Sequence, residues 1–220
     1  MIDLDRKAFA SNEKYSLYSL IDEEREMYYE LFKKRAMERN LDFDEKYLKL
    51  MWNSLHEIKS RVYSIYDNFD NYCGYIELDN PTSDTPEIGI EIAVDFRNKG
   101  IAPSIVPIFI KAVCEQQYVE YFEIKIYKTN SHSRHVFEKL GAEFVKEEKS
   151  EINEILKQTL DFVEKDYEKT RNRLENSYNT ESNDKLKKIL ELDSELKRIC
   201  SLYDSDVDVC VYKLSLDKFI

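Results

Sequence analysis

The chain has 220 residues, of which 42% are hydrophobic and 35% charged, so it can bury the core of one domain and carry an appendage. Its formal net charge of -11 disfavours a general nucleic-acid binder, whose domain carries a basic surface, and is compatible with a cationic substrate. No apolar run is long enough to cross a bilayer, and the N-terminal stretch lacks the apolar core of a signal peptide. We therefore expect a cytoplasmic protein that has neither a nucleic acid nor a membrane as its partner.

The four cysteines, Cys73, Cys114, Cys200 and Cys210, form no C-x-x-C pair and accompany no cluster of histidines. This pattern is typical of reduced structural thiols and not of a zinc site or a disulfide framework. We expect no metal.

The first predicted strand spans residues 15–20, and Asp22 is predicted to cap the helix that follows it. A second helix is predicted after the capping pair Asp42 and Glu45, because apolar side chains then recur at helical spacing. The apolar residues of the two helices, which we expect to lie mostly in the core, are Met27, Tyr28, Leu31, Phe32, Tyr47, Leu48, Met51, Trp52 and Leu55.

A hairpin is predicted from residues 61–66 and 72–78, which flank the turn-rich sequence DNFDN. The strand from Glu87 to Val94 should complete an antiparallel meander with this hairpin. Along that strand isoleucines alternate with polar or small residues, so Glu87 and Glu91 share the face opposite the isoleucines.

A short basic loop leads from this strand into a helix, and Pro103 is predicted at the first helical position. The loop and the first helical residues are Arg97, Asn98, Lys99, Gly100, Ile101 and Ala102. A glycine-bearing loop at a helix N-terminus presents backbone N–H groups and the positive end of the helix dipole, so it predicts a phosphate site. The chain has neither G-x-G-x-x-G nor G-x-x-x-x-G-K-[ST] at this point, which disfavours a dinucleotide site and a P-loop.

The next predicted strand spans residues 121–127, after which Asn130 or Ser131 can cap a helix. Gly141 should end that helix in a left-handed conformation, and a further strand should begin near Phe144. From Ser150 onward two amphipathic helices are predicted, separated by NTESND, before a last strand over residues 207–216. The apolar stripe of these two helices needs another surface to cover it. The stripe could pack on the domain, form a contact between two copies of the chain, or close as a lid over the acceptor site. The first two alternatives are favoured.

The pattern Arg-x-x-Gly-x-Ala after a strand, followed by Asn130-SHSRHVFEKLGAEF, resembles the two successive signatures of the GNAT superfamily, the Gcn5-related N-acetyltransferases. The resemblance spans roughly residues 15–147 and the last strand, and it is closest to the branch that acetylates ribosomal-protein N-termini. It implies an α/β (α+β) fold, with a mixed, mostly antiparallel, splayed sheet flanked by helices. It further implies an acetyltransferase domain of residues 1–149 and 206–220, with a helical hairpin of residues 150–205 inserted before the last strand.

The resemblance also implies a donor site for acetyl-coenzyme A. By position, backbone groups near Ile92 and Val94 would hold the pantetheine arm, while the loop from Arg97 to Ala102 would hold the pyrophosphate. Asn130 and Ser133 would face the thiol end. In the family, the first two helices lie beside the acceptor site. Tyr47 or Trp52 could therefore line a substrate cleft, as an alternative to lying in the core.

The sequence departs from many family members at Phe137, where they place a tyrosine that protonates the leaving thiolate. The spacing from Asn130 to Ser133 resembles the branch that acetylates ribosomal-protein N-termini, in which the serine is the proposed proton donor. The resemblance therefore implies Ser133 for this role, with water as the alternative, although a helix serine that faces solvent or bonds to the backbone would fit the sequence equally well.

An alkyl amine is mostly protonated at neutral pH and needs a proton acceptor before it can attack. Glu91 and then Glu87 are the candidates for that role, although a solvated strand face would place carboxylates there equally well. A backbone N–H near Val94 would hold the oxyanion.

The sequence thus predicts an acetyl-coenzyme A-dependent N-acetyltransferase whose acceptor is a small-molecule amine or a protein N-terminus. The alternative is a non-catalytic acyl-coenzyme A-binding module that recruits a partner through its helical hairpin. A homodimer formed through the same hairpin is compatible with either.

Overall fold

The computed structural model describes residues 6–38, 48–49, 52, 60–149 and 208–219. These residues belong to two compact units, and each unit is considered by itself. The first comprises Met1–Lys125, His132–Val145 and Val211–Ile220, and the second Ile126–Ser131 and Lys146–Cys210. The predicted domain boundaries at residues 150 and 205 lie outside the described residues and stay predictions.

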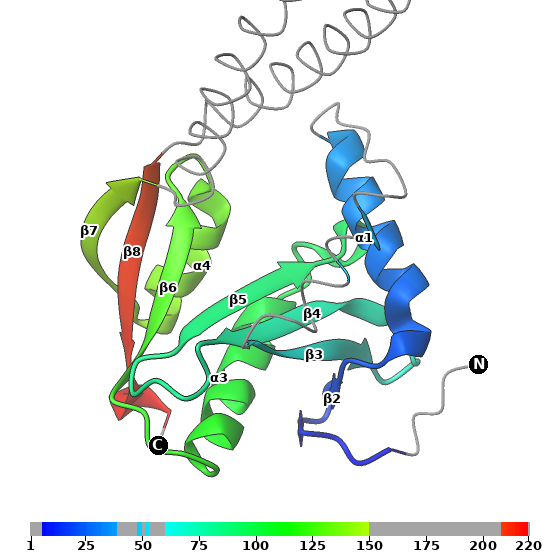
Figure 1. Ribbon diagram of the computed structural model, residues 1–220, viewed down its shortest axis with the longest axis horizontal. Coiled ribbons are helices and arrows are strands. Elements are labelled where there is room, and N and C mark those ends of the chain that lie inside the picture. Colours follow the sequence, from blue (N-terminus) through cyan, green and yellow to red (C-terminus); the bar gives the residue numbers. More distant parts are fainter. Residues whose placement is uncertain (1–5, 39–47, 50–51, 53–59, 150–207, 220) are drawn as a thin grey trace, which may run out of the picture. The chain divides into compact units, whose positions relative to one another are not determined.

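The sheet has eight strands in the order β1-β2-β3-β4-β5-β6-β8-β7. Neighbours from β1 to β5 are antiparallel, and β5 pairs with β6 in parallel through Glu87 and Glu123. This arrangement confirms the predicted mixed, mostly antiparallel α/β fold (Figure 1). The strands are β1 (Ala10–Ser11), β2 (Tyr15–Ser19), β3 (Ser60–Asp67), β4 (Tyr72–Asp79), β5 (Glu87–Ile92), β6 (Tyr121–Tyr127), β7 (Glu143–Lys149) and β8 (Asp208–Ser215).

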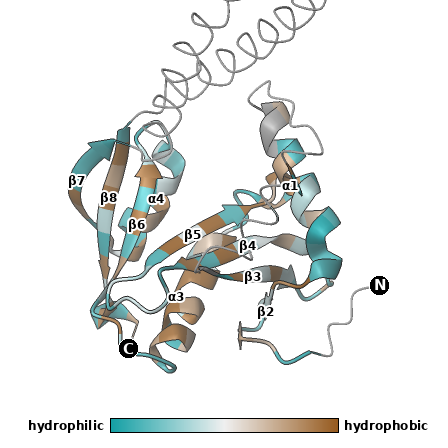
Figure 2. Ribbon diagram, in the orientation of Figure 1, coloured by the Kyte–Doolittle hydropathy of each residue, from teal (hydrophilic) through white to brown (hydrophobic). Residues whose placement is uncertain are grey.

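Helices α1 (Arg25–Glu38) and α3 (Ile101–Cys114) pack on opposite faces of β3 and β4. On one face Val62 joins Tyr28 and Phe32 of α1 in a buried cluster, whereas the next residue, Tyr63, packs its ring against Phe109 of α3. Since successive strand residues point to opposite sides, the two helices cover different faces. Figure 2 shows α3 apolar along most of its length. This agrees with the burial of many of its side chains.

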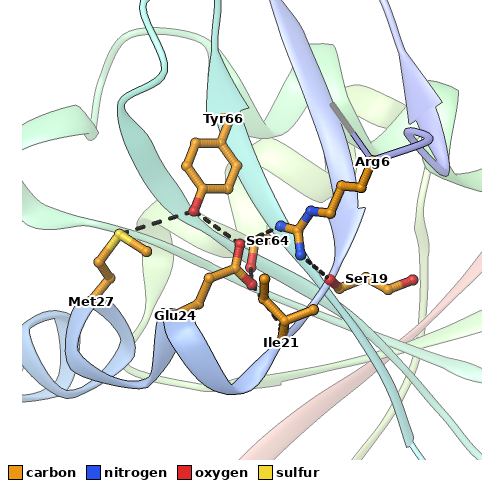
Figure 3. A network of polar contacts seen from close by, with 7 residues as sticks. All are labelled: Arg6, Ser19, Ile21, Glu24, Met27, Ser64 and Tyr66. Carbon is orange, nitrogen blue, oxygen red and sulfur yellow. Dashed lines mark hydrogen bonds and ion pairs between the residues drawn. The ribbon is translucent and has the colours of Figure 1, made fainter. Parts of the chain in front are cut away.

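The start of α1 is fixed by a buried carboxylate (Figure 3). Glu24 accepts hydrogen bonds from the Ile21 N–H, the Ser64 hydroxyl and the Tyr66 hydroxyl, and it pairs with Arg6. The prediction that Asp22 caps this helix is therefore wrong, because Asp22 is the first residue of a short 3-10 turn (Asp22–Glu24) whose cap is Ile21. The Glu24 carboxylate instead accepts a hydrogen bond from the backbone N–H of the cap residue, Ile21.

Strand β5 ends at Ile92, so the prediction that it continues to Val94 is wrong. Val94 begins a 3-10 turn, Val94–Phe96, and the Ala93 N–H donates to the Cys73 carbonyl at 2.9 Å. Gly74, which pairs with Ile92, has a φ of 140°, and a Cβ there would overlap the carbonyl oxygen of Glu91. This close approach brings the chain out of the sheet just before the basic loop.

Leu48 and Trp52, from the second predicted helix, are buried among the core residues of the α1 face. This agrees with the prediction that the aromatic stripe is core. Tyr47, the Asp42 and Glu45 cap and the predicted hairpin of residues 150–205 lie outside the described residues.

Cys73 and Cys210 are buried free thiols, and Cys114 is a half-buried one. Within the described ranges, no helix is long and apolar enough to span a membrane.

Candidate functional site

The basic loop after β5 adopts the backbone conformation of an anion cradle. Asn98 and Gly100 have positive φ angles of 62° and 74°, and Gly100 is the N-cap of α3. Because α3 begins at Ile101, Pro103 is its third residue, and the prediction that proline takes the first helical position is wrong. A backbone N–H at either position would have no intrahelical partner, so a proline, which lacks the N–H, removes no helical hydrogen bond at either one.

The N–H groups of residues 98–102 donate to no backbone carbonyl among the described residues, and the first backbone bond of α3 runs from the Ser104 N–H to the Gly100 carbonyl at 3.3 Å. A Cβ placed on Gly100 would meet no atom within 4 Å, so the loop is not covered at this residue. Backbone donors at the N-terminus of a 14-residue helix can hold a phosphate group. The loop therefore fits the diphosphate of a coenzyme.

The side chains of the loop make contacts within the same unit. Arg97 donates from Nε to the Ile92 carbonyl at 3.1 Å and from a terminal nitrogen to Glu91 Oε1 at 3.0 Å. The Lys99 ammonium lies 4.6 Å from the centre of the Phe96 ring. Arg97 thus connects two predicted site features, the Ile92 backbone and the Glu91 carboxylate, and this link was not predicted from the sequence.

Glu87 and Glu91 lie on the α1 face of β5, as the alternating pattern predicted. Glu87 forms an ion pair with Lys125 at 3.2 Å, and Lys125 also pairs with Glu123 at 3.3 Å. Burial raises the pKa of Glu87 above its ordinary value, which Lys125 offsets in part. Both carboxylates therefore have a cationic partner, a lysine for Glu87 and the loop arginine for Glu91.

Glu77 of β4 is a third carboxylate on this face and was missed in the sequence. It pairs in register with Gly89, and a Cβ on Gly89 would overlap its side chain, so the absence of that carbon provides the room it occupies. Burial, and after it the nearby carboxylates of Asp79, Glu87 and Glu91, raise the pKa of Glu77 to about 8. The β4–β5 register places Glu77 between Glu87 and Glu91, and the spacing of residues in the sequence gives no direct signal of that register.

Helix α4 (Ser131–Leu140) carries the remaining predicted residues. Ser133 is half-buried in its first turn, and Phe137 is buried with 2% exposure, so its ring belongs to the core. Gly141, with φ 98°, ends the helix as predicted. Asn130 precedes α4 and belongs to the second unit, where its N–H donates to the Tyr127 carbonyl at 2.8 Å. The described residues hold no group of metal ligands.

Comparison with known families gives a match that covers most of the first unit. The model of the acetyltransferase (GNAT) domain matches residues 10–143. No curated protein sequence matches the chain.

Two solved structures illustrate the similarity in fold. One is a spermidine N-acetyltransferase from Vibrio cholerae in complex with CoA and spermine, 18% identical, with a TM-score of 0.54 over 64% of this chain and 87% of that one. The other is RimL, a ribosomal L7/L12 alpha-N-protein acetyltransferase in complex with coenzyme A, 13% identical, with a TM-score of 0.59 over 96% and 99%. At these identities the likeness is one of fold.

Proposed function

The chain belongs to the GNAT family of acetyltransferases, and from that premise we propose that it transfers an acetyl group from acetyl-coenzyme A to a primary amine. The observation that carries this proposal is the loop from Arg97 to Ala102, with its two left-handed residues, its backbone donors and the uncovered position of Gly100. When bound, acetyl-coenzyme A supplies the activated thioester that the amine attacks.

The donor would be held by the backbone and side chains that follow β5. The N–H groups of residues 98–102 and the Arg97 guanidinium are suited to the diphosphate, because they supply neutral and charged donors on one short segment. The backbone of Ile92 and Val94, where the chain leaves the sheet, would hold the pantetheine arm. Asn130 and Ser133 stay proposals for the thiol end.

Glu91 is proposed as the group that accepts the proton of the acceptor ammonium, directly or through water. It stands next to Ile92, at the end of β5 where the thioester would lie, whereas Glu87 stands at the opposite end and pairs with Lys125. Deprotonation supplies the nitrogen lone pair that forms the new N–C bond. A backbone N–H near Val94 would stabilise the oxyanion.

Ser133 is proposed as the donor of a proton to the departing thiolate, with water as the alternative. Phe137 cannot fill that role, since its ring has no exchangeable proton and lies in the core. The serine hydroxyl in the first turn of α4 is half-buried.

The acceptor is proposed to be a small cationic amine or a protein N-terminus. The two structures compared above carry the names of enzymes for spermidine and for a ribosomal protein N-terminus, both amine acceptors. The carboxylates of Glu87 and Glu91 on the α1 face of β5 favour a cation on this side of the sheet. A cytoplasmic location, and a homodimer through residues 150–205, also stay proposals.

Calorimetric titration with acetyl-coenzyme A tests donor binding. Gly100→Glu, which places bulk and negative charge before the backbone donors, should abolish the binding heat. Gly100→Ala adds only a methyl group in open space and should retain binding. Failure of the unmodified protein to bind the coenzyme would overturn the proposal.

Mass spectrometry of a panel of amines, with acetyl-coenzyme A in excess, tests the transfer. Glu91→Gln should lower turnover by about 10²-fold to 10⁴-fold, the usual contribution of a positioned proton acceptor. If the coenzyme binds but no amine is acetylated, the alternative of a non-catalytic coenzyme-binding module is favoured.

A further inference from the structure

Arg97 holds the proposed proton acceptor and the last carbonyl of β5 at the same time. Its Nε donates to the Ile92 carbonyl at 3.1 Å, and a terminal nitrogen pairs with Glu91 at 3.0 Å. The arginine side chain is 34% exposed and that of Glu91 18%. In this arrangement the loop cation neutralises the carboxylate that the reaction needs as a proton acceptor, and it covers a carbonyl assigned to the pantetheine arm.

We propose that Arg97 is a positioning residue that restrains Glu91 until the diphosphate of the donor occupies the loop. The inference rests on the proposed function, because it takes Glu91 as the proton acceptor and the loop as the donor site. Donor binding would turn the guanidinium toward the diphosphate, and this would release both Glu91 and the Ile92 carbonyl.

The competition follows from the chemistry of the groups. A guanidinium pairs with phosphate oxygens through parallel N–H donors, and a diphosphate carries more negative charge than one carboxylate. The backbone donors of residues 98–102 directly follow Arg97 in the chain, so an anion held by them lies within reach of its side chain. The partly exposed pair with Glu91 is weak enough to be exchanged.

The released carboxylate can then take part in proton transfer. The acceptor ammonium gives one proton to Glu91, and the resulting amine forms the N–C bond with the acyl carbon to give a tetrahedral intermediate, whose collapse breaks the C–S bond. The second amine proton is lost from the tetrahedral intermediate and ends on the departing thiolate. The proton on Glu91 passes to solvent before the next turnover. In the donor-free protein the same carboxylate faces Arg97, so the inference predicts that donor binding precedes productive acceptor binding.

This restraint makes a prediction that distinguishes it from a purely catalytic role for Glu91. Energy used to separate Arg97 from Glu91 is lost from donor binding, so removing the carboxylate charge should tighten that binding. Glu91→Gln should lower the dissociation constant of coenzyme A by about twofold to fivefold, the range expected for one partly exposed ion pair. If Glu91 were only a proton acceptor, the dissociation constant would stay unchanged.

Glu87→Gln is the matched control, because it removes the same charge from the same strand face. Glu87 pairs with Lys125 and not with the loop arginine. A general electrostatic effect of fewer carboxylates would tighten coenzyme binding in both variants, whereas release of Arg97 would tighten it in Glu91→Gln alone.

The decisive measurement is a double-mutant cycle of coenzyme A affinity by calorimetry, with the unmodified chain, Glu91→Gln, Arg97→Ala and the double variant. Arg97→Ala should weaken binding, and adding Glu91→Gln to it should bring no further change. Tightening by Glu91→Gln in the Arg97→Ala background, or none in the unmodified chain, would overturn the inference.

The outcomes also separate this inference from the function on which it rests. Slower turnover of Glu91→Gln with unchanged coenzyme affinity retains Glu91 as proton acceptor and rejects the restraint. If Glu91→Gln binds coenzyme A more tightly but turns over at an unchanged rate, Glu91 has no catalytic role. Release of Glu91 from Arg97 is then not a step in catalysis. Absence of coenzyme binding to the unmodified chain rejects both.

Discussion

Two acidic side chains on the α1 face of the sheet have contrasting surroundings. Glu24 is fully buried but accepts three hydrogen bonds and pairs with Arg6. Glu77 is half-buried beside Asp79, Glu87 and Glu91, and in the described part of the chain no cation or hydrogen-bond donor contacts it. A satisfied carboxylate stabilises a fold, whereas a desolvated one among like charges opposes it. The environment of Glu24 therefore stabilises the fold. The environment of Glu77 lowers the free energy of unfolding when this carboxylate is charged.

We predict that Glu77 makes the protein less stable as the pH rises through neutrality. Its pKa is about 8 in the folded chain against an ordinary value of 4.5. Between those values the folded state binds a proton that the unfolded state has released, so the free energy of unfolding falls as pH increases across that window. Glu77→Gln should remove this fall and should raise the free energy of unfolding at pH 8 by on the order of 2 kcal/mol.

Urea denaturation at pH 5 and pH 8 provides the test. Glu143→Gln is the control, since Glu143 is an exposed residue of β7 and its replacement should leave both midpoints nearly unchanged. Equal stability of Glu77→Gln and the unmodified chain at pH 8 would show that solvent or a bound cation already compensates the charge.

At the residue scale, the sequence predicted the carboxylates of β5 but not their partners. Alternation along residues 87–92 is a local pattern, and it placed Glu87 and Glu91 on one face correctly. The pair between Arg97 and Glu91 depends on the 3-10 turn that reverses the chain between them, and the position of Glu77 depends on the register of two strands. Neither follows from spacing alone.

At the scale of elements, the end of β5 is set by its neighbour. Gly74 of β4 adopts a φ of 140° against the Glu91 carbonyl, next to a register shift between Ile65 and Tyr66 of β3. The 3-10 turn Val94–Phe96 follows the end of β5, and the basic loop then leads to the N-terminus of α3. The geometry of the loop therefore depends on a glycine that lies outside the family signature.

We predict that Gly74→Ala disrupts this arrangement far more than Gly100→Ala does. The added carbon at Gly74 would overlap backbone, which cannot move aside, whereas at Gly100 it meets open space. Gly100→Ala should lower the free energy of unfolding only by the cost of a left-handed alanine, roughly 1–2 kcal/mol. Gly74→Ala should cost more than about 3 kcal/mol and weaken coenzyme A binding as the end of β5 shifts.

Thermal denaturation of both variants, with coenzyme titrations on the folded fraction, compares the two positions. Equal melting temperatures would contradict the role assigned to Gly74.

The sequence predicted the existence and order of the elements better than their ends. The hairpin of β3 and β4 and helix α3 were confirmed because alternation and helical stripes are strong signals. The ends at Asp22, Val94 and Pro103 were wrong, since Glu24, the Cys73 carbonyl and Gly100 fix them through other contacts. The two-residue strand β1 was missed because it is too short to show a period.

At the scale of the whole molecule, the match to the acetyltransferase family covers residues 10–143 and leaves the long charged segment from Ser150 without a counterpart in that match. The amino-acid pattern of that segment predicts two amphipathic helices, and a two-helix hairpin buries too little apolar surface to be stable alone. If self-association supplies the missing surface, the apolar stripe forms the contact between two copies.

We predict that Leu156→Asp combined with Leu160→Asp, in the full chain, converts a dimer into a monomer. Two carboxylates within the apolar stripe would lose their hydration on association, which costs several kcal/mol and exceeds what a small helical interface contributes. Gln158→Asp changes charge on the polar side of the same predicted helix and should leave the dimer intact. Light scattering at matched concentrations gives the mass of each variant, and an unchanged mass for the leucine variant would favour packing of the stripe on its own domain. Coenzyme titration of that variant then separates the two roles, because a pure association surface leaves the affinity at the Arg97 to Ala102 loop unaltered.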